Sequence, residues 1–378
     1  MANTLTADSA TLLAELETWV RMETPTTHPA MVNALMDVAE ASLRAAGAEV
    51  TRHPGTDGFA DTLVARTPGR AAADGRVGLI AGHLDTVWDP GTLARMPFRV
   101  EGDRAHGPGI FDMKAGSFLA LHVFCAILRQ RVPTARPLVL LLTPDEEMGS
   151  PSSRALIERE ARRAAWALIP EPAGAGGACV TARKGVGRFV LRVTGRGAHA
   201  GNGFADGASA VVELAEQIRA VHAMVDQERG VTLNAAPVWG GTRPNVIAPE
   251  AGCEIDLRVS TAADGAALEA ALLGLAARTP GCVVAVTGGM NRPPYAETAA
   301  ELGLYETART VAHGLGMKLP KQSRGGGSDG NFTAALGVPT LDGLGCPGGG
   351  AHVASEHILW PELGRRAALL AGIIEALP

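Results

Sequence analysis

A histidine and an aspartate, separated by one residue, follow an apolar segment of the sequence. Residues 77–81 are apolar and are predicted to form a strand, and the motif GHLDTV (residues 82–87) comes directly after them. In an extended chain, residues i and i+2 point to the same side, so His83 and Asp85 can act together. We expect His83 to bind a metal and Asp85 to orient its imidazole from behind. A surface histidine beside an aspartate is the alternative for this motif alone.

A glycine-rich loop carries the next candidate, Asp112. The loop, GPGIFDMKAG (residues 107–116), opens into a predicted helix. The two oxygens of a carboxylate can bridge two cations, and hydrolases with two metal ions need such a bridge. An ordinary helix N-cap would also place an aspartate at this position.

Three consecutive acidic residues follow a second apolar strand. The strand is predicted over residues 138–142, and the motif TPDEEMGS (residues 143–150) comes after it. Like charges repel at the end of a buried strand, and a nearby cation removes that penalty. Because adjacent side chains point in different directions, either Glu146 or Glu147 can bind metal while the other is directed at the attacking water. A solvated acidic loop is the alternative.

Two further motifs complete the set. Glu171 follows the short apolar segment 166–169, and His352 ends the glycine-rich run 347–352. In open α/β sheets, sites form at the carboxyl ends of strands. Two histidines and three carboxylates suit two borderline cations such as Zn²⁺, each with an open position for water. The combination is far more specific than any single motif.

The elements that must position these residues follow a strand–helix–strand order. Helices are predicted over residues 11–21, 30–46 and 117–129, and strands over 62–65, 77–81 and 138–142. Compact apolar strands alternating with helices indicate a largely buried parallel sheet. A helix at 300–315, a strand at 338–342 and a helix at 360–376 resume this pattern near the C-terminus.

The middle of the chain has a different character. Strands are predicted at 188–195, 232–238, 251–260 and 282–287, with helices at 208–221 and 265–277. This βαββαβ order is that of a small ferredoxin-like sandwich. We therefore expect an α/β protein with two domains. Residues 1–180 and 295–378 form a catalytic domain with a mixed, mostly parallel sheet and helices on both faces, and residues 181–294 form an inserted domain.

Composition excludes several classes of function. The net charge of −5 gives no support to nucleic acid or an acidic membrane as a partner. The first residues lack a basic segment followed by an apolar core, so we expect no secretory signal. The five cysteines are scattered, without a CxxC pair, which favours reduced thiols and a cytoplasmic location.

The motifs, in this order, resemble those of the M20 metallopeptidase family, and within it the glutamate carboxypeptidase branch. The resemblance covers nearly the whole chain. It includes three further segments, GRGAHAG (195–201), RPNVIAPEAGCEIDLRVS (243–260) and RGGGSDGNF (324–332). It implies a catalytic zinc domain and an inserted lid domain through which two subunits form a homodimer.

The resemblance also implies roles for individual residues. Asp112 would bridge the two metals, and the Asp112–Met113 peptide bond would be cis. The remaining ligands would be His83 with Glu171 for one metal and Glu147 with His352 for the other.

Glu146 would be the general base, and Asp85 would support His83. In the inserted domain, His199, Asn245 and Arg258 would contact the substrate carboxylate or the oxyanion. A lone arginine on a strand is otherwise usually solvated.

The expected activity is hydrolysis of an amide bond next to a free carboxylate, in a peptide or an acyl amino acid. Two Zn²⁺ per subunit are expected, with Co²⁺ or Mn²⁺ as substitutes. Glu146 would take a proton from the attacking water and pass it to the leaving amine. The alternatives are an N-acyl amino acid deacylase, an acetylornithine-type deacetylase or a dipeptidase of the same family, and a metal- or ligand-binding protein without catalysis.

Glutamate at position 171 argues mildly against the desuccinylase branch of the family. No Lys or Arg lies between Glu171 and Arg183, so a cation that would recognise a glutamate side chain is not evident there.

Overall fold

The computed structural model describes residues 8–69 and 72–378, and it divides into two compact units. Unit 1 comprises Met1–Ala182, Glu297–Ser323 and Ser328–Pro378, and unit 2 comprises Arg183–Ala296 and Arg324–Gly327. We expected boundaries near residues 181 and 294. The segment Arg324–Gly327, which we placed in the catalytic domain, groups with unit 2, where the Arg324 carbonyl accepts a hydrogen bond from the Lys184 backbone N–H.

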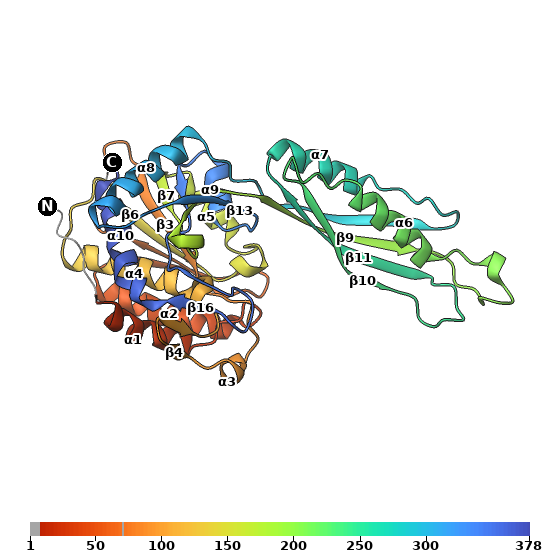
Figure 1. Ribbon diagram of the computed structural model, residues 1–378, viewed down its shortest axis with the longest axis horizontal. Coiled ribbons are helices and arrows are strands. Elements are labelled where there is room, and N and C mark those ends of the chain that lie inside the picture. The colour runs from red at the N-terminus through yellow and green to blue at the C-terminus, as the bar shows by residue number, and fades with distance from the viewer. Residues whose placement is uncertain (1–7, 70–71) are drawn as a thin grey trace. The chain divides into compact units, whose positions relative to one another are not determined.

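A six-stranded sheet forms the centre of unit 1 (Figure 1). Its order is β1-β2-β6-β3-β7-β14, with bounds β1 (Glu49–His53), β2 (Thr62–Arg66), β6 (Leu138–Thr143), β3 (Val77–His83), β7 (Ala164–Leu168) and β14 (Thr340–Leu341). The pairs β6–β3, β3–β7 and β7–β14 are parallel, whereas β1–β2 and β2–β6 are antiparallel. The expected mixed, mostly parallel sheet is confirmed.

Helices cover both faces of this sheet. One face packs against α1 (Ser9–Val20), α2 (Pro29–Ala45), α4 (Ala115–Arg129), α8 (Ala299–Gly314) and α10 (Leu363–Ala376), and the other against α5 (Arg154–Ala161) and α9 (Gly330–Ala335). Strand β6 shows the division, because Leu140 and Leu142 lie in the first core cluster and Val139 and Leu141 in the second. Such alternation follows from the two-residue period of a strand.

Shorter elements complete unit 1. A small sheet has the order β15-β16-β5-β4, with bounds β15 (Gly348–Gly349), β16 (His357–Leu359), β5 (Arg104–His106) and β4 (Arg99–Glu101). Strand β8 (Cys179–Arg183) pairs with β13 (Lys321–Arg324), and α3 (Thr92–Arg95) is a single turn. None of these short elements was predicted, because they lack the compact apolar runs that marked the central strands.

Unit 2 is an antiparallel sheet with two helices. The sheet order is β10-β11-β9-β12, with bounds β10 (Thr232–Gly240), β11 (Glu250–Val259), β9 (Gly185–Thr194) and β12 (Val283–Arg292). Helices α6 (Ala210–His222) and α7 (Ala262–Leu273) lie together along one face of the sheet (Figure 1). The chain order β9-α6-β10-β11-α7-β12 is the predicted βαββαβ order.

Several predicted boundaries shift by a few residues. Helix α7 begins at Ala262, before the predicted residue 265, because Thr261 caps it by accepting from the Asp264 N–H. Helix α10 begins at Leu363, after a 3₁₀ turn over Trp360–Glu362. The stretch Ile110–Arg129, which includes a kink at Asp112 and Met113 before α4, is apolar and long enough to cross a membrane, but 83% of its most apolar window is buried inside the protein.

Candidate metal centre

Three of the candidate side chains lie at the carboxyl ends of neighbouring strands. In the order β6-β3-β7, the three strands are parallel, and His83 at the end of β3 is in register with Thr143 at the end of β6. Glu146 follows Thr143 by three residues, and Glu171 follows the end of β7 at Leu168 by three. The parallel register therefore brings these acidic turns to the imidazole of His83.

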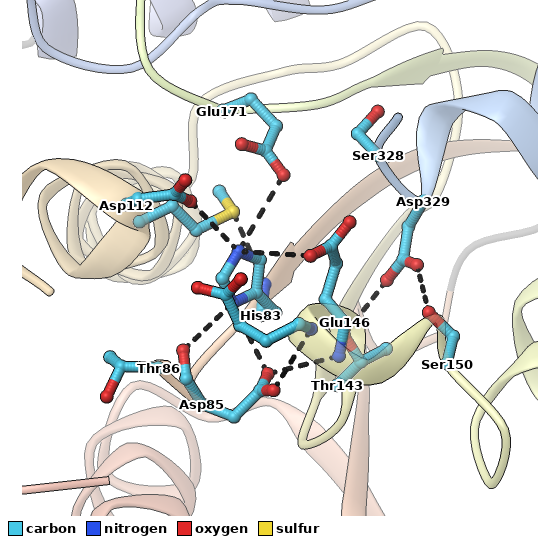
Figure 2. Close-up of polar contacts among 12 residues, drawn as sticks. His83, Asp85, Thr86, Asp112, Thr143, Glu146, Ser150, Glu171, Ser328 and Asp329 are labelled. Carbon is cyan, nitrogen blue, oxygen red and sulfur yellow. Dashed lines mark hydrogen bonds and ion pairs between the residues drawn. The ribbon is translucent and has the colours of Figure 1, made fainter. Parts of the chain in front are cut away.

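The imidazole of His83 points into a group of carboxylates (Figure 2). Its Nε2 lies 3.4 Å from Asp112 Oδ1, 3.7 Å from Glu171 Oε1 and 4.0 Å from Glu146 Oε2. Within the described residues, this buried nitrogen has no hydrogen-bond partner. Ligands about 2.0–2.2 Å from a tetrahedral ion lie roughly 3.3–3.6 Å from one another, so the distances from His83 to Asp112 and from His83 to Glu171 are close to those between ligands of one cation.

A second group forms on the other oxygen of Asp112. His352 Nε2 lies 3.3 Å from Asp112 Oδ2 and 3.3 Å from Glu147 Oε2. The buried Glu147 Oε1 has no hydrogen-bond partner in the described part of the chain. Asp112 thus directs one oxygen toward each histidine, which is the geometry that a bridging carboxylate requires.

Distances alone do not decide which of Glu146 and Glu147 binds metal. One set of mutually close ligand atoms comprises His83, Asp112 and Glu147, and another comprises His83, Glu146 and Glu171. Glu146 gives the longest of the contacts to His83, and its side chain is 12% exposed. Its assignment as a base, and that of Glu147 as a ligand, therefore remain predictions.

The carboxylates of the cluster favour bound positive charge, as the pKa shifts of its side chains indicate. Burial alone lowers the pKa of His83, but the neighbouring Asp112 and Asp85 raise it well above its usual value. The carboxylates of Asp112 and Glu147 raise the pKa of His352, and burial raises the pKa of Glu147. Without a cation, the cluster therefore favours bound protons in the positions that metal ions would neutralise.

Asp85 fixes both the histidine and the acidic turn. Its Oδ1 lies 3.3 Å from His83 Nδ1 and also accepts from the Glu146 N–H, while Oδ2 accepts from Thr26 Oγ1 and from the Glu147 N–H. The position behind His83 is the one that we predicted. The contacts to the backbone of the glutamates were not predicted.

The loop that carries Asp112 packs closely against the loop that carries Glu171. The Asp112–Met113 peptide bond is cis, as the resemblance implied. A Cβ atom at Gly116 would lie 1.7 Å from the Pro170 carbonyl oxygen, so only glycine allows this approach at the start of α4. The contact holds Asp112 and Glu171 on the same side of the cluster.

Sequence reasoning missed Glu356, which anchors the Asp112 loop. Its fully buried carboxylate accepts from the backbone N–H groups of Gly109, Phe111 and Asp112 and from Trp88 Nε1, at 2.7–3.0 Å. Glu356 therefore connects the segment of His352 to the bridging residue. Its position four residues after His352 was the signal in the sequence.

Sequence reasoning also missed two supporting aspartates. Asp329, in the segment that we quoted as RGGGSDGNF, accepts from the hydroxyls of Thr143 and Ser150 (Figure 2). Asp145 accepts from the backbone N–H groups of Ser152 and Ser153. Burial raises the pKa of Asp145 to about 6. Both residues stabilise the turn that holds Glu146 and Glu147.

The remaining candidate residues belong to unit 2. His199 and Asn245 are brought together, because the Asn245 carbonyl accepts from the Ala200 N–H and His199 pairs with Val246. His199 Nδ1 accepts from the backbone N–H groups of Gly201 and Asn202. A neutral imidazole in this setting carries its proton on Nε2, where it can serve as a donor.

Arg258 has a different environment from the one that we expected. Its guanidinium binds Asp256 in a bidentate ion pair, with Nε–Oδ1 at 2.6 Å and Nη2–Oδ2 at 2.8 Å. Asp256 and Arg258 lie two residues apart on β11 and therefore share a face of the sheet. The fork that we assigned to a substrate carboxylate is occupied by this neighbour.

We expect Glu356→Gln to loosen the Asp112 loop. The amide would direct N–H donors at backbone donors, and each buried hydrogen bond lost in this way costs about 1–3 kcal/mol. The variant should unfold at a lower temperature and bind less zinc per chain. Glu254→Gln, at an exposed position of β11, is the control. Wild-type melting and zinc content in Glu356→Gln would show that this carboxylate does not position the loop.

Comparison with known proteins agrees with this geometry. The sequence matches Peptidase family M20/M25/M40 over residues 79–376. It is 31% identical to carboxypeptidase G2 from Pseudomonas sp. (strain RS-16), over 98% of this chain and 90% of that protein, and 28% identical to acetylornithine deacetylase from Myxococcus xanthus, over 65% of each. A crystal structure of a tripeptidase from Staphylococcus aureus shares the fold, with a TM-score of 0.77 at 20% identity and 98% coverage of both chains. The chain therefore belongs to peptidase family M20/M25/M40, as a metallohydrolase similar to carboxypeptidase G2.

Proposed function

We propose that this protein is a di-zinc hydrolase that cleaves the amide bond next to a free carboxylate in a peptide or an acyl amino acid. The observation that carries this proposal is the division of the Asp112 carboxylate between His83 and His352. The buried, unpartnered His83 Nε2 and Glu147 Oε1 fit a metal pair held by these residues. The similarity to carboxypeptidase G2 over nearly the whole chain supports the choice of substrate.

The chain's own residues provide the proton transfers. Two bound cations would polarise the scissile carbonyl and lower the pKa of a water molecule. The Glu146 carboxylate would take the proton of that water and deliver it to the leaving amine. The Asp85 carboxylate accepts a hydrogen bond from the Glu146 backbone N–H, and this contact keeps the base at the edge of the cluster.

Unit 2 would supply recognition of the substrate. The Nε2–H of His199 is suited to an oxyanion, because a fixed donor stabilises the charge that develops in the transition state. Asn245 and Arg258 would hold the substrate carboxylate, and Arg258 suits this role because its fork can bind both oxygens. The substrate carboxylate would have to replace Asp256 on the guanidinium.

An N-acyl amino acid deacylase or acetylornithine-type deacetylase is the second candidate. It is favoured by the lack of Lys and Arg between Glu171 and Arg183, where no cation is available for a glutamate side chain. The similarity to acetylornithine deacetylase supports it over part of the chain. A dipeptidase would use the same centre.

A substrate panel tests the proposal. Zinc-loaded protein should hydrolyse acyl and peptidyl amino acids with a free α-carboxylate, and amidation of that carboxylate should abolish turnover. Preference for acetyl amino acids over aryl-acyl or peptidyl ones would favour the deacetylase. Equal turnover of the free and amidated substrates would contradict recognition of the carboxylate. Lack of turnover across the panel by protein with two zinc ions would favour a binding protein.

Glu146 and Glu147 should differ when each is changed to glutamine. Glu147→Gln removes a proposed ligand, so zinc per chain and activity should fall together. Glu146→Gln should keep nearly full zinc and lower kcat by about 10²–10⁴-fold, the usual contribution of general acid–base catalysis. Zinc analysis followed by measurement of kcat and KM separates the two. Loss of zinc in Glu146→Gln with full zinc in Glu147→Gln would reverse the assignment.

We also propose a homodimer formed through unit 2. Strand β10 is an outer strand of the sheet and carries Val238, and Val211 of α6 packs at Gly240 of the same strand. Val211, Val212 and Val238 are 44%, 57% and 54% exposed. An open strand edge beside exposed apolar side chains is suited to pairing with a second copy.

Val238→Lys should therefore shift the protein toward the monomer, because a charge at the contact would have to be desolvated. Val283→Lys, on the opposite outer strand β12, places the same charge at a site that is 65% exposed and should leave the dimer intact. Sedimentation velocity at micromolar concentration measures both variants. A monomeric wild type, or equal dissociation of the two variants, would contradict this interface.

We propose a cytoplasmic location as well. All five cysteines are free and buried. Their scattered positions and reduced state suit a compartment that keeps thiols reduced.

A further inference from the structure

Unit 1 has a cavity beside α10 that none of the candidate metal ligands lines. Its volume is about 330 Å³. One wall is the glycine-rich turn Gly174–Gly177, and another is the beginning of α10 with Arg365 and Arg366. The cavity belongs to no step of the proposed hydrolysis.

Arg366 is the most unusual residue of this cavity. Its side chain is 1% exposed, and among the described residues no carboxylate lies within ion-pair distance of it. Its Nη2 donates to the carbonyls of Gly177 at 3.0 Å and Gly343 at 3.5 Å, whereas its buried Nε has no acceptor. This guanidinium has no carboxylate counter-ion within ion-pair distance among the described residues. A buried charge that is not paired is costly.

The two thiols near Arg366 do not supply that charge. Burial raises the pKa of Cys179 and of Cys346 to about 12, so both are neutral at physiological pH. Burial lowers the pKa of Arg366, and Cys179, Cys346 and Glu362 offset this effect only in part.

Two more cations line the same cavity. Lys318 is exposed, and Arg365 is half-exposed with Glu362 at 3.5 Å. Three cationic side chains and one carboxylate therefore leave an excess of two positive charges. The excess matches a dianion better than it matches a single carboxylate.

The backbone around the cavity also suits an oxyanion. Gly176 and Gly177 have positive φ values of 66° and 78°, and a turn without side chains lets a ligand come close to the main chain. The 14-residue helix α10 begins at the cavity, and the partial positive charge of a helix N-terminus attracts anions.

We propose that this cavity binds a phosphate group, either as inorganic phosphate or as the phosphate of a small organic monoester. A phosphate carries about −1.5 to −2 charges at pH 7 and three strong acceptor oxygens. Arg366 provides the buried, charge-assisted contact, and Arg365 with Lys318 closes the site from the solvent side. The site is separate from the metal centre and independent of the hydrolysis proposed for it.

Titration with inorganic phosphate, in the intact zinc-loaded chain at constant ionic strength, tests the proposal. Phosphate can also bind zinc, so the informative comparison is between variants. In calorimetry, the double variant Lys318→Ala/Arg365→Ala should bind phosphate about tenfold or more weakly than the wild type, since two charge-assisted contacts are lost. Arg309→Ala is the matched control, because Arg309 is an exposed helical arginine paired with Glu306 three residues earlier, as Arg365 is with Glu362. It should bind like the wild type.

Three outcomes would overturn the proposal. Equal phosphate affinity in the double variant and the wild type would place the anion at the metals. Lack of binding at tens of millimolar phosphate would contradict the proposal, because a site with weaker affinity would be largely empty. Acetate binding as tightly as phosphate would contradict the dianion. Glycerol 3-phosphate binding more tightly than phosphate would identify an organic monoester, and equal or weaker binding would identify the free anion.

Arg366→Met gives a second test that does not depend on the exposed residues. An apolar side chain of similar length removes the uncompensated charge, so the variant should fold, and loss of phosphate binding with unchanged zinc content is expected. Unchanged phosphate binding in the folded variant would show that Arg366 has only a structural role. If the variant does not fold, the comparison of the double variant with Arg309→Ala decides the question.

Discussion

Four carboxylates and two imidazoles meet at the carboxyl ends of β6, β3 and β7, and the repulsion among the carboxylates has to be balanced by positive charge. Acidic neighbours raise the pKa of His352 and burial raises that of Glu147, so protons can supply part of this charge. Two divalent cations would supply it with fixed geometry and displace those protons. The requirement for this charge explains why acidic residues occupy the ends of strands whose interiors are entirely apolar.

The cluster keeps its geometry because its supports are backbone donors. Asp85 accepts from the N–H groups of Glu146 and Glu147, and Glu356 accepts from three N–H groups of the Asp112 loop. Hydrogen bonds to charged groups are stronger than neutral ones, and backbone donors cannot rotate away. The candidate metal ligands are therefore positioned by two carboxylates that are not themselves candidate ligands.

Sequence patterns predicted the parts of this protein that follow a simple rule. Apolar runs and the position of sites at strand ends located His83, Glu146 and Glu171, and the βαββαβ order identified the fold of unit 2. The role of Glu356 was missed because its partners are backbone groups almost 250 residues away, and only its position four residues after His352 pointed to it. The Asp256–Arg258 pair could have been found, because the same i, i+2 rule that joined His83 with Asp85 applies on β11.

The acidic cluster of candidate metal ligands and the cationic cavity beside α10 are lined by the same loops of unit 1. The chain leaves the negative cluster at Glu171 and reaches the glycine-rich wall of the positive cavity three residues later, at Gly174. It lines that cavity again at Pro347 and Gly348 before it returns to the cluster at His352. The Gly345 N–H donates to the Glu171 carbonyl and connects the two loops. Each excess is costly without a ligand of the opposite sign, so cations in the cluster and an anion in the cavity would each stabilise one side of these loops.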